Sequence, residues 1–311
     1  MKHFLLFVFA LFLLPFALSV EATEPNPVEK PGWKLTFQDE FDRPLLNDLY
    51  WYAAYRTGQR EYLTRPGGKG LSPSLKFHDN NALYKIEDGL LKLIIDETVP
   101  PRLNKTDLAV SCLTTSDHRF GKDMTEYQVL EKFAQKYGWF ETRCKSIKGS
   151  GLYTAFWLHQ TDPTDQEFTL DGHWGRDHVV EIDIFELVGK EATEGVGLFN
   201  VFFPKTKDGY SQHRTATEPL QDFPCEHNKY KTGFDPSQDF HTYAMEWQEG
   251  EINWYIDNKK TLTYRGETPQ KKMFILLALF QGRGGWSGEV SKDQTYPVIF
   301  EVDYVRVYEK E

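Results

Sequence analysis

Three carboxylic side chains lie close together in residues 181–186, whose sequence is Glu-Ile-Asp-Ile-Phe-Glu. In an extended strand alternate side chains share a face, so Glu181 and Asp183 point to the same side. Strict alternation would place Phe185, not Glu186, beside them. One inserted residue, a β-bulge, would return Glu186 to the acidic face. We therefore expect a bulged strand with three aligned carboxylates. Because like charges this close resist ionising together, at least one of their pKa values should be raised.

Three kinds of chemistry are compatible with such a cluster. Two carboxyl groups roughly 5–5.5 Å apart can serve as the nucleophile and the acid/base of a retaining glycosidase. Clustered carboxylates also bind hard cations such as Ca²⁺. A Glu-x-Asp pair can also be the water-facing side of an amphipathic strand. The six residues alone leave these alternatives open.

The surrounding chain is predicted to be one long run of strands. Short β-rich segments recur between turn signals at residues 34–38, 90–95, 139–145, 152–159, 179–187, 242–248, 252–256, 273–280 and 300–308. Asp88-Gly89 and Asp257-Asn258 are typical of tight hairpin turns. Residues 124–136 fit either a helix or a strand. The absence of βα alternation argues against a parallel sheet, so we expect an all-β fold, a single large antiparallel sandwich.

Composition excludes several classes of protein. The chain has 311 residues, 40% of them hydrophobic and 26% charged, which argues against a disordered tail, a collagen-like fibre and a polytopic membrane protein. The net charge of −10 argues against nucleic-acid binding, which needs clustered Lys and Arg. In an acidic chain, the 15% aromatic content favours sugars as the partners of any exposed rings. Three cysteines, Cys112, Cys144 and Cys225, allow at most one internal disulfide and show no metal-ligand spacing.

The N-terminal residues predict export. Met1-Lys2-His3 precedes an apolar run that ends near Val20, and small residues follow it. We expect residues 1–22 to be a signal peptide, 23–32 a short linker and 33–311 one domain. The alternative is an uncleaved membrane anchor, but the run is slightly short and no basic stop-transfer cluster follows it. The expected location is therefore secreted or periplasmic, without stable membrane insertion.

Several further motifs, in order along the chain, resemble those of glycoside hydrolase family 16. The signature of that family is Glu-x-Asp-x-(x)-Glu, and the longer, bulged form is present here. The other matching segments are residues 37–42 followed by Trp51, 58–62, 137–143, 151–158 and 302–308. Thr154 stands where the family usually has Pro. The loop 284–288 departs from the Gly-Gly-Asn-Trp-Pro-Gly sequence that is usual in laminarinases.

The resemblance implies a fold and a set of roles. The fold would be a β-jelly-roll sandwich of two antiparallel sheets, with the substrate cleft on the concave sheet, so residues 33–311 would form the catalytic domain. Glu181 would be the nucleophile, Glu186 the general acid/base, and Asp183 would tune the charge between them. Candidates for sugar binding are side chains able to stack on a ring or to bond with hydroxyls, namely Trp157, Trp174, Trp286, Arg60 and His178. His159 follows Trp157, and a lone histidine of this kind is more often structural or exposed.

Some members of the family carry a structural Ca²⁺ on the convex side. Glu40, Gly89 and Asp303 occupy matching positions here. Asp303 could instead cap a turn or pair with Arg306. No other cofactor is expected.

The resemblance implies a secreted, endo-acting, retaining hydrolase of β-linked polysaccharide, most simply a β-1,3-glucanase of the laminarin type. A β-galactan hydrolase (agarase, porphyranase or carrageenase) is the alternative, and the departures at Thr154 and around Trp286 keep it open. A non-catalytic glucan-binding protein is disfavoured because all three acids are present. The expected partner is the polysaccharide alone, and the chain is expected to be a monomer.

Overall fold

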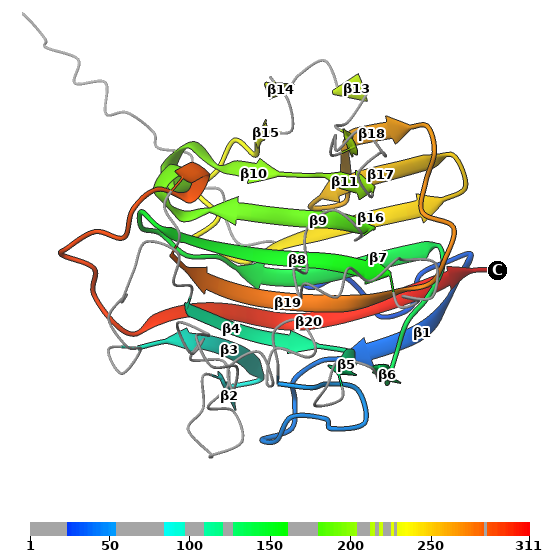
Figure 1. Ribbon diagram of the computed structural model, residues 1–311, viewed down its shortest axis with the longest axis horizontal. Helices are drawn as coiled ribbons and strands as arrows, with labels where there is room; N and C mark the ends of the chain where they lie inside the picture. Colours follow the sequence, from blue (N-terminus) through cyan, green and yellow to red (C-terminus); the bar gives the residue numbers. More distant parts are fainter. Residues whose placement is uncertain are drawn as a thin grey trace, which may run out of the picture.

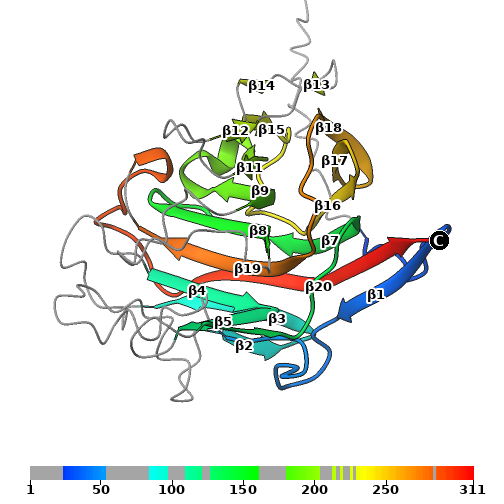
Figure 2. The same ribbon diagram turned by 45° about the vertical axis from the view of Figure 1, so that its right-hand side comes forward.

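The protein folds as two stacked antiparallel β-sheets. The computed structural model describes residues 24–53, 84–96, 109–120, 127–160, 180–203, 212–214, 218–219, 225–226, 229–282 and 285–311, and the structural statements below concern those residues. Figures 1 and 2 show the two sheets as layers whose strands run in similar directions. The predicted all-β sandwich is confirmed.

The first sheet contains the strands nearest the two ends of the described chain. Its order is β13-β18-β17-β16-β7-β20-β3-β2, and β1 also pairs with β20. The strands are β1 (Trp33–Asp39), β2 (Tyr84–Glu87), β3 (Leu90–Ile95), β7 (Gly138–Lys145), β13 (Glu218–Pro219), β16 (His241–Gln248), β17 (Glu251–Ile256), β18 (Lys259–Arg265) and β20 (Val298–Lys310).

The second sheet contains the acidic strand. Its order is β14-β15-β10-β9-β8-β19-β4, with β11 pairing both β9 and β12. The strands are β4 (Ala109–Thr114), β8 (Leu152–Gln160), β9 (Glu181–Val188), β10 (Val196–Leu198), β11 (Val201–Phe203), β12 (Gln212–Arg214), β14 (Cys225–Glu226), β15 (Lys229–Lys231) and β19 (Met273–Gln281). A separate hairpin joins β5 (Ser116–Phe120) and β6 (Tyr127–Glu131), and two short 3₁₀ helices are η2 (Gly189–Glu194) and η3 (Gly285–Ser287).

Local sequence accounts for the hairpins. Asp88 and Gly89 have φ of 58° and 72°, and Asp257 and Asn258 have φ of 48° and 64°. Two central residues with positive φ are typical of a turn whose twist matches the twist of its strands, so both predicted hairpins are confirmed. Within the ambiguous segment 124–136, the part that forms regular structure is a strand, β6.

The core lies between the sheets, and β19 shows how it is built. Met273, Ile275, Leu277 and Leu279 point into the main core. The residues between them point to the outer face of the second sheet, where they pack with side chains of β4 and β8. Because both faces of β19 are buried, its sequence is a continuous apolar run with no polar alternation.

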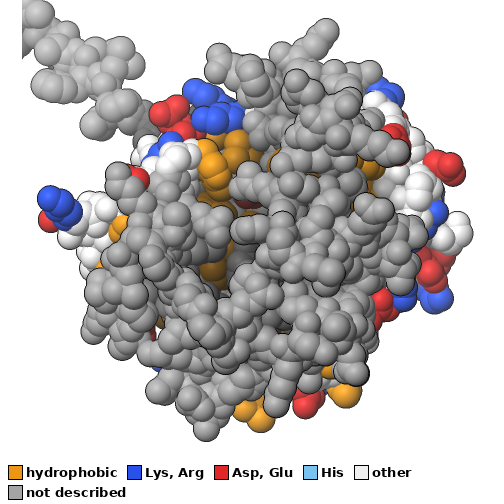
Figure 3. Space-filling model, viewed as in Figure 1, with side chains coloured by type: hydrophobic (Ala, Val, Ile, Leu, Met, Phe, Trp, Pro, Cys, Tyr) orange, Lys and Arg blue, Asp and Glu red, His pale blue; other side chains and the backbone are white. Residues whose placement is uncertain are grey.

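The outer face of the second sheet carries the acidic strand. Seen from the direction of Figure 1, the space-filling surface has a recess with hydrophobic side chains in it (Figure 3). Among the described residues, no helix is long and apolar enough to cross a membrane.

Candidate active site

The acidic strand β9 contains the predicted bulge. In its pairing with β8, Phe156 lies opposite Phe185, while the next residue, Trp157, lies opposite Asp183. Ile184 is therefore the extra residue of β9. Ile184 and Phe185 both point into the core between the sheets. The bulge thus shifts the alternation by one residue and returns Glu186 to the face that carries the first two acids.

Asn200 connects two of the three acids. Its side-chain Nδ2 donates to Oδ2 of Asp183 at 2.8 Å and lies 3.3 Å from Oε2 of Glu186. The backbone carbonyl of Asn200 accepts a hydrogen bond from the N–H of Asp183 at 2.9 Å. This bond holds the side-chain amide of Asn200 next to β9. Asn200 itself is buried. One side chain therefore sets the spacing between Asp183 and Glu186.

Asp183 has a raised pKa. Burial raises its pKa well above 3.8, and the negative charges of Glu186 and Glu181 raise it further. The hydrogen bond from Asn200 opposes this shift, whereas a hydrogen bond shared with Glu181 adds to it. The raised pKa predicted for the cluster is confirmed. A protonated Asp183 can donate to the carboxylate of Glu181.

Glu181 has a second partner, on β8. Nε2 of His159 lies 2.6 Å from Oε2 of Glu181, and His159 is the residue opposite Glu181 in the ladder. The side chain of His159 is 4% exposed, and that of Glu181 is 20% exposed. The indole Nε1 of Trp157 donates to the same imidazole nitrogen at 3.1 Å. His159, which the sequence alone leaves as a structural or exposed histidine, is therefore in direct contact with the predicted nucleophile.

Among the predicted sugar-binding residues, Trp157 and Trp286 differ in exposure. Trp157 is 4% exposed and packs against Phe280, with 5.8 Å between ring centroids. Trp286 on η3 is 41% exposed and contacts Tyr153, which stacks on Phe280 with 4.4 Å between centroids. The ring of Trp286 is therefore open for stacking on a sugar. Trp157 is buried instead, and it packs against His159 and Phe280. Arg60, Trp174 and His178 lie outside the described residues.

Sequence reasoning missed Asn200 and underrated His159. His159 lies two residues after Trp157, so period-2 alternation places both on the same face, and pairing of this strand with the acidic one would have brought His159 next to Glu181. No comparable signal marks Asn200, because its contact depends on the path of the chain between β10 and β11.

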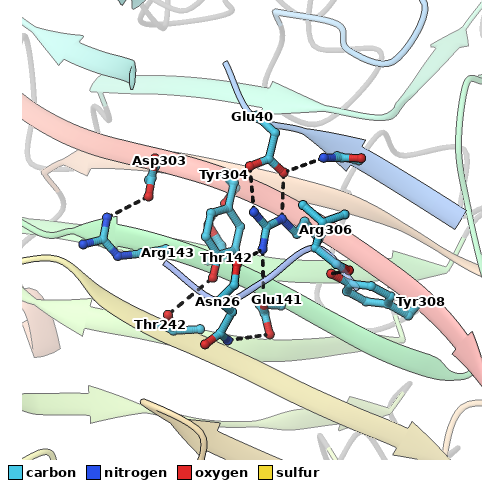
Figure 4. A network of polar contacts seen from close by, with 12 residues as sticks. Asn26, Glu40, Glu141, Thr142, Arg143, Thr242, Asp303, Tyr304, Arg306 and Tyr308 are labelled. Atoms are coloured by element: carbon cyan, nitrogen blue, oxygen red, sulfur yellow. Dashed lines mark hydrogen bonds and ion pairs between the residues drawn. The ribbon is translucent and has the colours of Figure 1, made fainter. Parts of the chain in front are cut away.

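Two of the three predicted calcium residues, Glu40 and Asp303, lie in the polar network of Figure 4, which belongs to the first sheet. Both carboxylate oxygens of Glu40 accept from Arg306, from Nε and Nη2, each at 2.7 Å. Asp303 pairs with Arg143 at 2.7 Å, and not with Arg306, because a bulge between Val302 and Tyr304 turns it away.

The carboxylates of Glu40 and Asp303 each already have a guanidinium partner, Arg306 and Arg143 respectively. Within the described part of the chain, no three His, Cys, Asp or Glu side chains gather in a way that could hold a metal ion. Gly89 lies in the hairpin turn between β2 and β3, with φ of 72°. In this arrangement the carboxylates of Glu40 and Asp303 are each engaged by an arginine, so calcium binding there would require these ion pairs to open.

Comparison with known proteins agrees with this geometry. The family model "Glycosyl hydrolases family 16" matches residues 80–305, which is more than half of the chain. A beta-glucanase of Acetivibrio thermocellus is 34% identical over 179 residues, covering 55% of this chain and 42% of that protein. A beta-glucanase of Brevibacillus brevis is 32% identical over 172 residues, covering 55% of each. The chain thus spans about half the length of these relatives.

Solved structures share the fold. The GlcNAcα1-4Gal-releasing endo-β-galactosidase of Clostridium perfringens superposes with a TM-score of 0.67 at 24% identity, covering 93% of this chain and 65% of that one. The catalytic domain of an endo-1,3-β-glucanase (laminarinase) of Thermotoga petrophila RKU-1 superposes with a TM-score of 0.56 at 22% identity, covering 90% of this chain and 98% of that one. These likenesses establish the β-jelly-roll sandwich. With the family match and the bulged acidic strand, they show that this chain belongs to family 16 of the glycosyl hydrolases.

Proposed function

We propose that the protein is a secreted, endo-acting, retaining hydrolase of β-linked polysaccharide, with β-1,3-glucan of the laminarin type as its substrate. The observation that carries the proposal is the bulged strand β9, which aligns Glu181, Asp183 and Glu186 on one face. The contact between Asp183 and Glu186 through Asn200 supports it.

The reaction has two displacements. In the first, the carboxylate of Glu181 attacks the anomeric carbon, the bond to the leaving oxygen breaks, and Glu186 gives that oxygen its proton. In the second, Glu186 takes a proton from water, the water oxygen attacks the anomeric carbon, and Glu181 leaves. Two inversions retain the configuration of the sugar.

Asp183 keeps the two glutamates in different protonation states. Burial and the charges of its neighbours raise the pKa of Asp183 well above 3.8, so Asp183 keeps its proton to higher pH than a free aspartate does. The proton of Asp183 is then available to the carboxylate of Glu181. A protonated Asp183 also adds no negative charge to the acidic row, the three side chains Glu181, Asp183 and Glu186 on one face of β9. Such an environment separates a charged nucleophile from a neutral acid.

The choice of glucan rests on the relatives. The curated relatives described above are named beta-glucanases, and the Thermotoga petrophila domain is an endo-1,3-β-glucanase. One observation favours the alternative, a β-galactan: the endo-β-galactosidase of Clostridium perfringens superposes with the higher TM-score, 0.67 against 0.56.

A reducing-sugar screen on laminarin, lichenan, agarose, porphyran and carrageenan tests the proposal. We expect laminarin to be cut, with oligosaccharides appearing before glucose because an endo-acting enzyme cleaves inside the chain. Clear cleavage of a galactan without action on laminarin would favour the alternative. Activity on none of the five would contradict both.

Export is part of the proposal. Residues 1–22 form the predicted signal peptide, so protein sequencing of secreted material should find an N-terminus near Thr23. Recovery of the intact Met1 segment in the membrane fraction would contradict export of a free enzyme.

A further inference from the structure

We propose that His159 is a positioning residue for Glu181: its Nε2–H donates to the carboxylate and makes Glu181 the member of the acidic row that carries the negative charge. This inference rests on the role of Glu181 as nucleophile proposed above. It gives a function to a buried histidine that lies outside the Glu-x-Asp-x-x-Glu motif.

The contact is short and enclosed. Nε2 of His159 lies 2.6 Å from Oε2 of Glu181, and the side chain of His159 is 4% exposed. The ladder between β8 and β9 places the two residues opposite each other, so the backbone fixes their approach. Hydrogen bonds to charged groups are stronger than neutral ones and gain strength away from water.

The imidazole ring is held in its plane by neighbours. Phe274 on β19 meets it edge-on with 5.8 Å between centroids, and Trp157 meets it edge-on with 6.2 Å. A ring packed between two aromatic side chains has few orientations to lose when it makes a hydrogen bond, so the geometry is pre-organised.

The proton must be on Nε2 when Glu181 is ionised. A carboxylate only accepts hydrogen bonds, so the 2.6 Å contact requires a donor on the imidazole. The indole of Trp157 is a donor only, and its Nε1 lies 3.1 Å from the same Nε2. One nitrogen cannot both donate to Glu181 and accept from Trp157. The two bonds therefore belong to alternative states: the indole of Trp157 donates to Nε2 when that nitrogen is unprotonated, and Nε2–H donates to Glu181 in the state with an ionised nucleophile.

The acidic row explains why a donor is needed there. Asp183 and Glu186 are ionisable groups on the same face of β9 as Glu181, so without a nearby donor the negative charge has no fixed place among the three carboxyl groups. Trp157 on β8 and Phe274 on β19 bring no charge. His159 supplies the asymmetry that lets Glu181, and not its neighbours, ionise first.

Substitution of His159 tests this directly. His159→Phe keeps a ring but removes the donor, and it should lower kcat/KM on an activated aryl β-glycoside by roughly 10- to 100-fold. The acid limb of the pH profile should move to higher pH, because Glu181 then ionises less readily. His159→Gln retains an N–H at a similar reach. It should restore part of the activity and return the acid limb of the pH profile most of the way to its wild-type position.

A matched control is available in the first sheet. His241 is equally buried and its Nδ1 lies 2.8 Å from Asp257, far from the acidic row in the sequence and in another sheet. His241→Gln should lower the melting temperature without moving the acid limb. An acid limb that stays in place in His159→Phe would overturn the proposal, because a merely structural histidine would show that pattern.

Two spectroscopic readouts require no substrate. The ¹⁵N shifts of labelled histidine should show a proton on Nε2 of His159, and the ¹³C signal of the Glu181 carboxyl, assigned with Glu181→Gln, should titrate at higher pH in His159→Phe than in the wild type. An unprotonated Nε2 at neutral pH would overturn the pairing. If both signals behave as expected but the wild type cuts no glycan, the proposed function fails and the pairing stands.

Discussion

Trp254 of the first sheet donates its indole N–H to the backbone carbonyl of Asp183 in the second sheet, at 2.9 Å. The bond crosses the core and meets β9 immediately before the bulge at Ile184. Trp254 is fully buried, so the bond is made away from water. A side chain on the far layer therefore anchors the backbone that aligns the three acids.

Trp254→Phe should cost both stability and activity. The substitution keeps most of the apolar volume but leaves the carbonyl of Asp183 without this donor, at a cost of about 1–3 kcal/mol in the free energy of unfolding. The freed backbone should also displace the carboxylates and lower kcat. Urea denaturation and a glycosidase assay measure the two effects.

Trp247 provides the control for this substitution. It is also buried, but among the described residues its Nε1 has no hydrogen-bond partner. Trp247→Phe should lose packing only and leave kcat near that of the wild type. Equal losses of activity in the two variants would argue against an anchoring role for the Trp254 bond.

The stability of the protein should depend on the protonation of Asp183. Burial, Glu186 and Glu181 raise its pKa well above 3.8, so folding favours the protonated form. The resulting stabilisation is complete below about pH 3.8, the unfolded value, and is lost as pH rises through the folded-state pKa. Asp183→Asn, which cannot ionise, should remove this loss.

Urea denaturation of the wild type and of Asp183→Asn, repeated from pH 4 to pH 8, checks this dependence. We expect the difference between their unfolding free energies to shift in favour of the variant as pH rises. Parallel curves for the two proteins would mean that Asp183 titrates alike in the folded and unfolded chains.

How much of the fold and of the acidic site the sequence predicts depends on how far apart the interacting residues are along the chain. The bulge of β9 follows from six adjacent residues, and the two hairpins follow from Asp-Gly and Asp-Asn pairs, because local backbone geometry decides each of them. Trp254 and Asp183 are 71 positions apart, and Arg306 and Glu40 are 266 apart. Such contacts depend on strand order and sheet packing, which no local pattern specifies.

The ion pair between the buried Arg306 and the partly exposed Glu40 should take the place of a metal ion in stabilising the outer face of the first sheet. Arg306 also donates to the carbonyl of Asn26 at 2.7 Å and stacks on Tyr304 at 3.7 Å, so its loss would leave several groups unpaired. Arg306→Met should cost about 3 kcal/mol of unfolding free energy. EDTA should leave the melting temperature of the wild type unchanged, and added CaCl₂ should not raise it.

Calorimetric scans of the wild type with EDTA and with calcium, beside scans of Arg306→Met, separate the two possibilities. Lys34→Met is the matched control, because Lys34 forms an exposed ion pair with Glu309 and such pairs contribute little. A clear rise in melting temperature with calcium would mean that the ion displaces the arginines from Glu40 and Asp303.

The two glutamates should have different roles that azide can separate. On an unactivated glucan, Glu186→Gln should lower turnover by about 10²- to 10⁴-fold, the usual contribution of a general acid, and Glu181→Gln should abolish the covalent step. Both side chains lie on the outer face of β9 and not in the core, so both variants should fold normally. Circular dichroism checks the fold before the kinetics are compared.

An activated aryl β-glycoside, whose leaving group needs little protonation, distinguishes the variants. With it, Glu186→Gln should form the glycosyl-enzyme and then stall, because no base activates water. Azide should then react with that intermediate and give the β-glycosyl azide after two inversions. With Glu181→Gln, azide should enter directly from the opposite face of the sugar and give the α-glycosyl azide.

The opposite pair of products in the NMR spectra would reverse the roles of Glu181 and Glu186. Release of the α-anomer as the first product of wild-type hydrolysis would rule out the retaining mechanism itself.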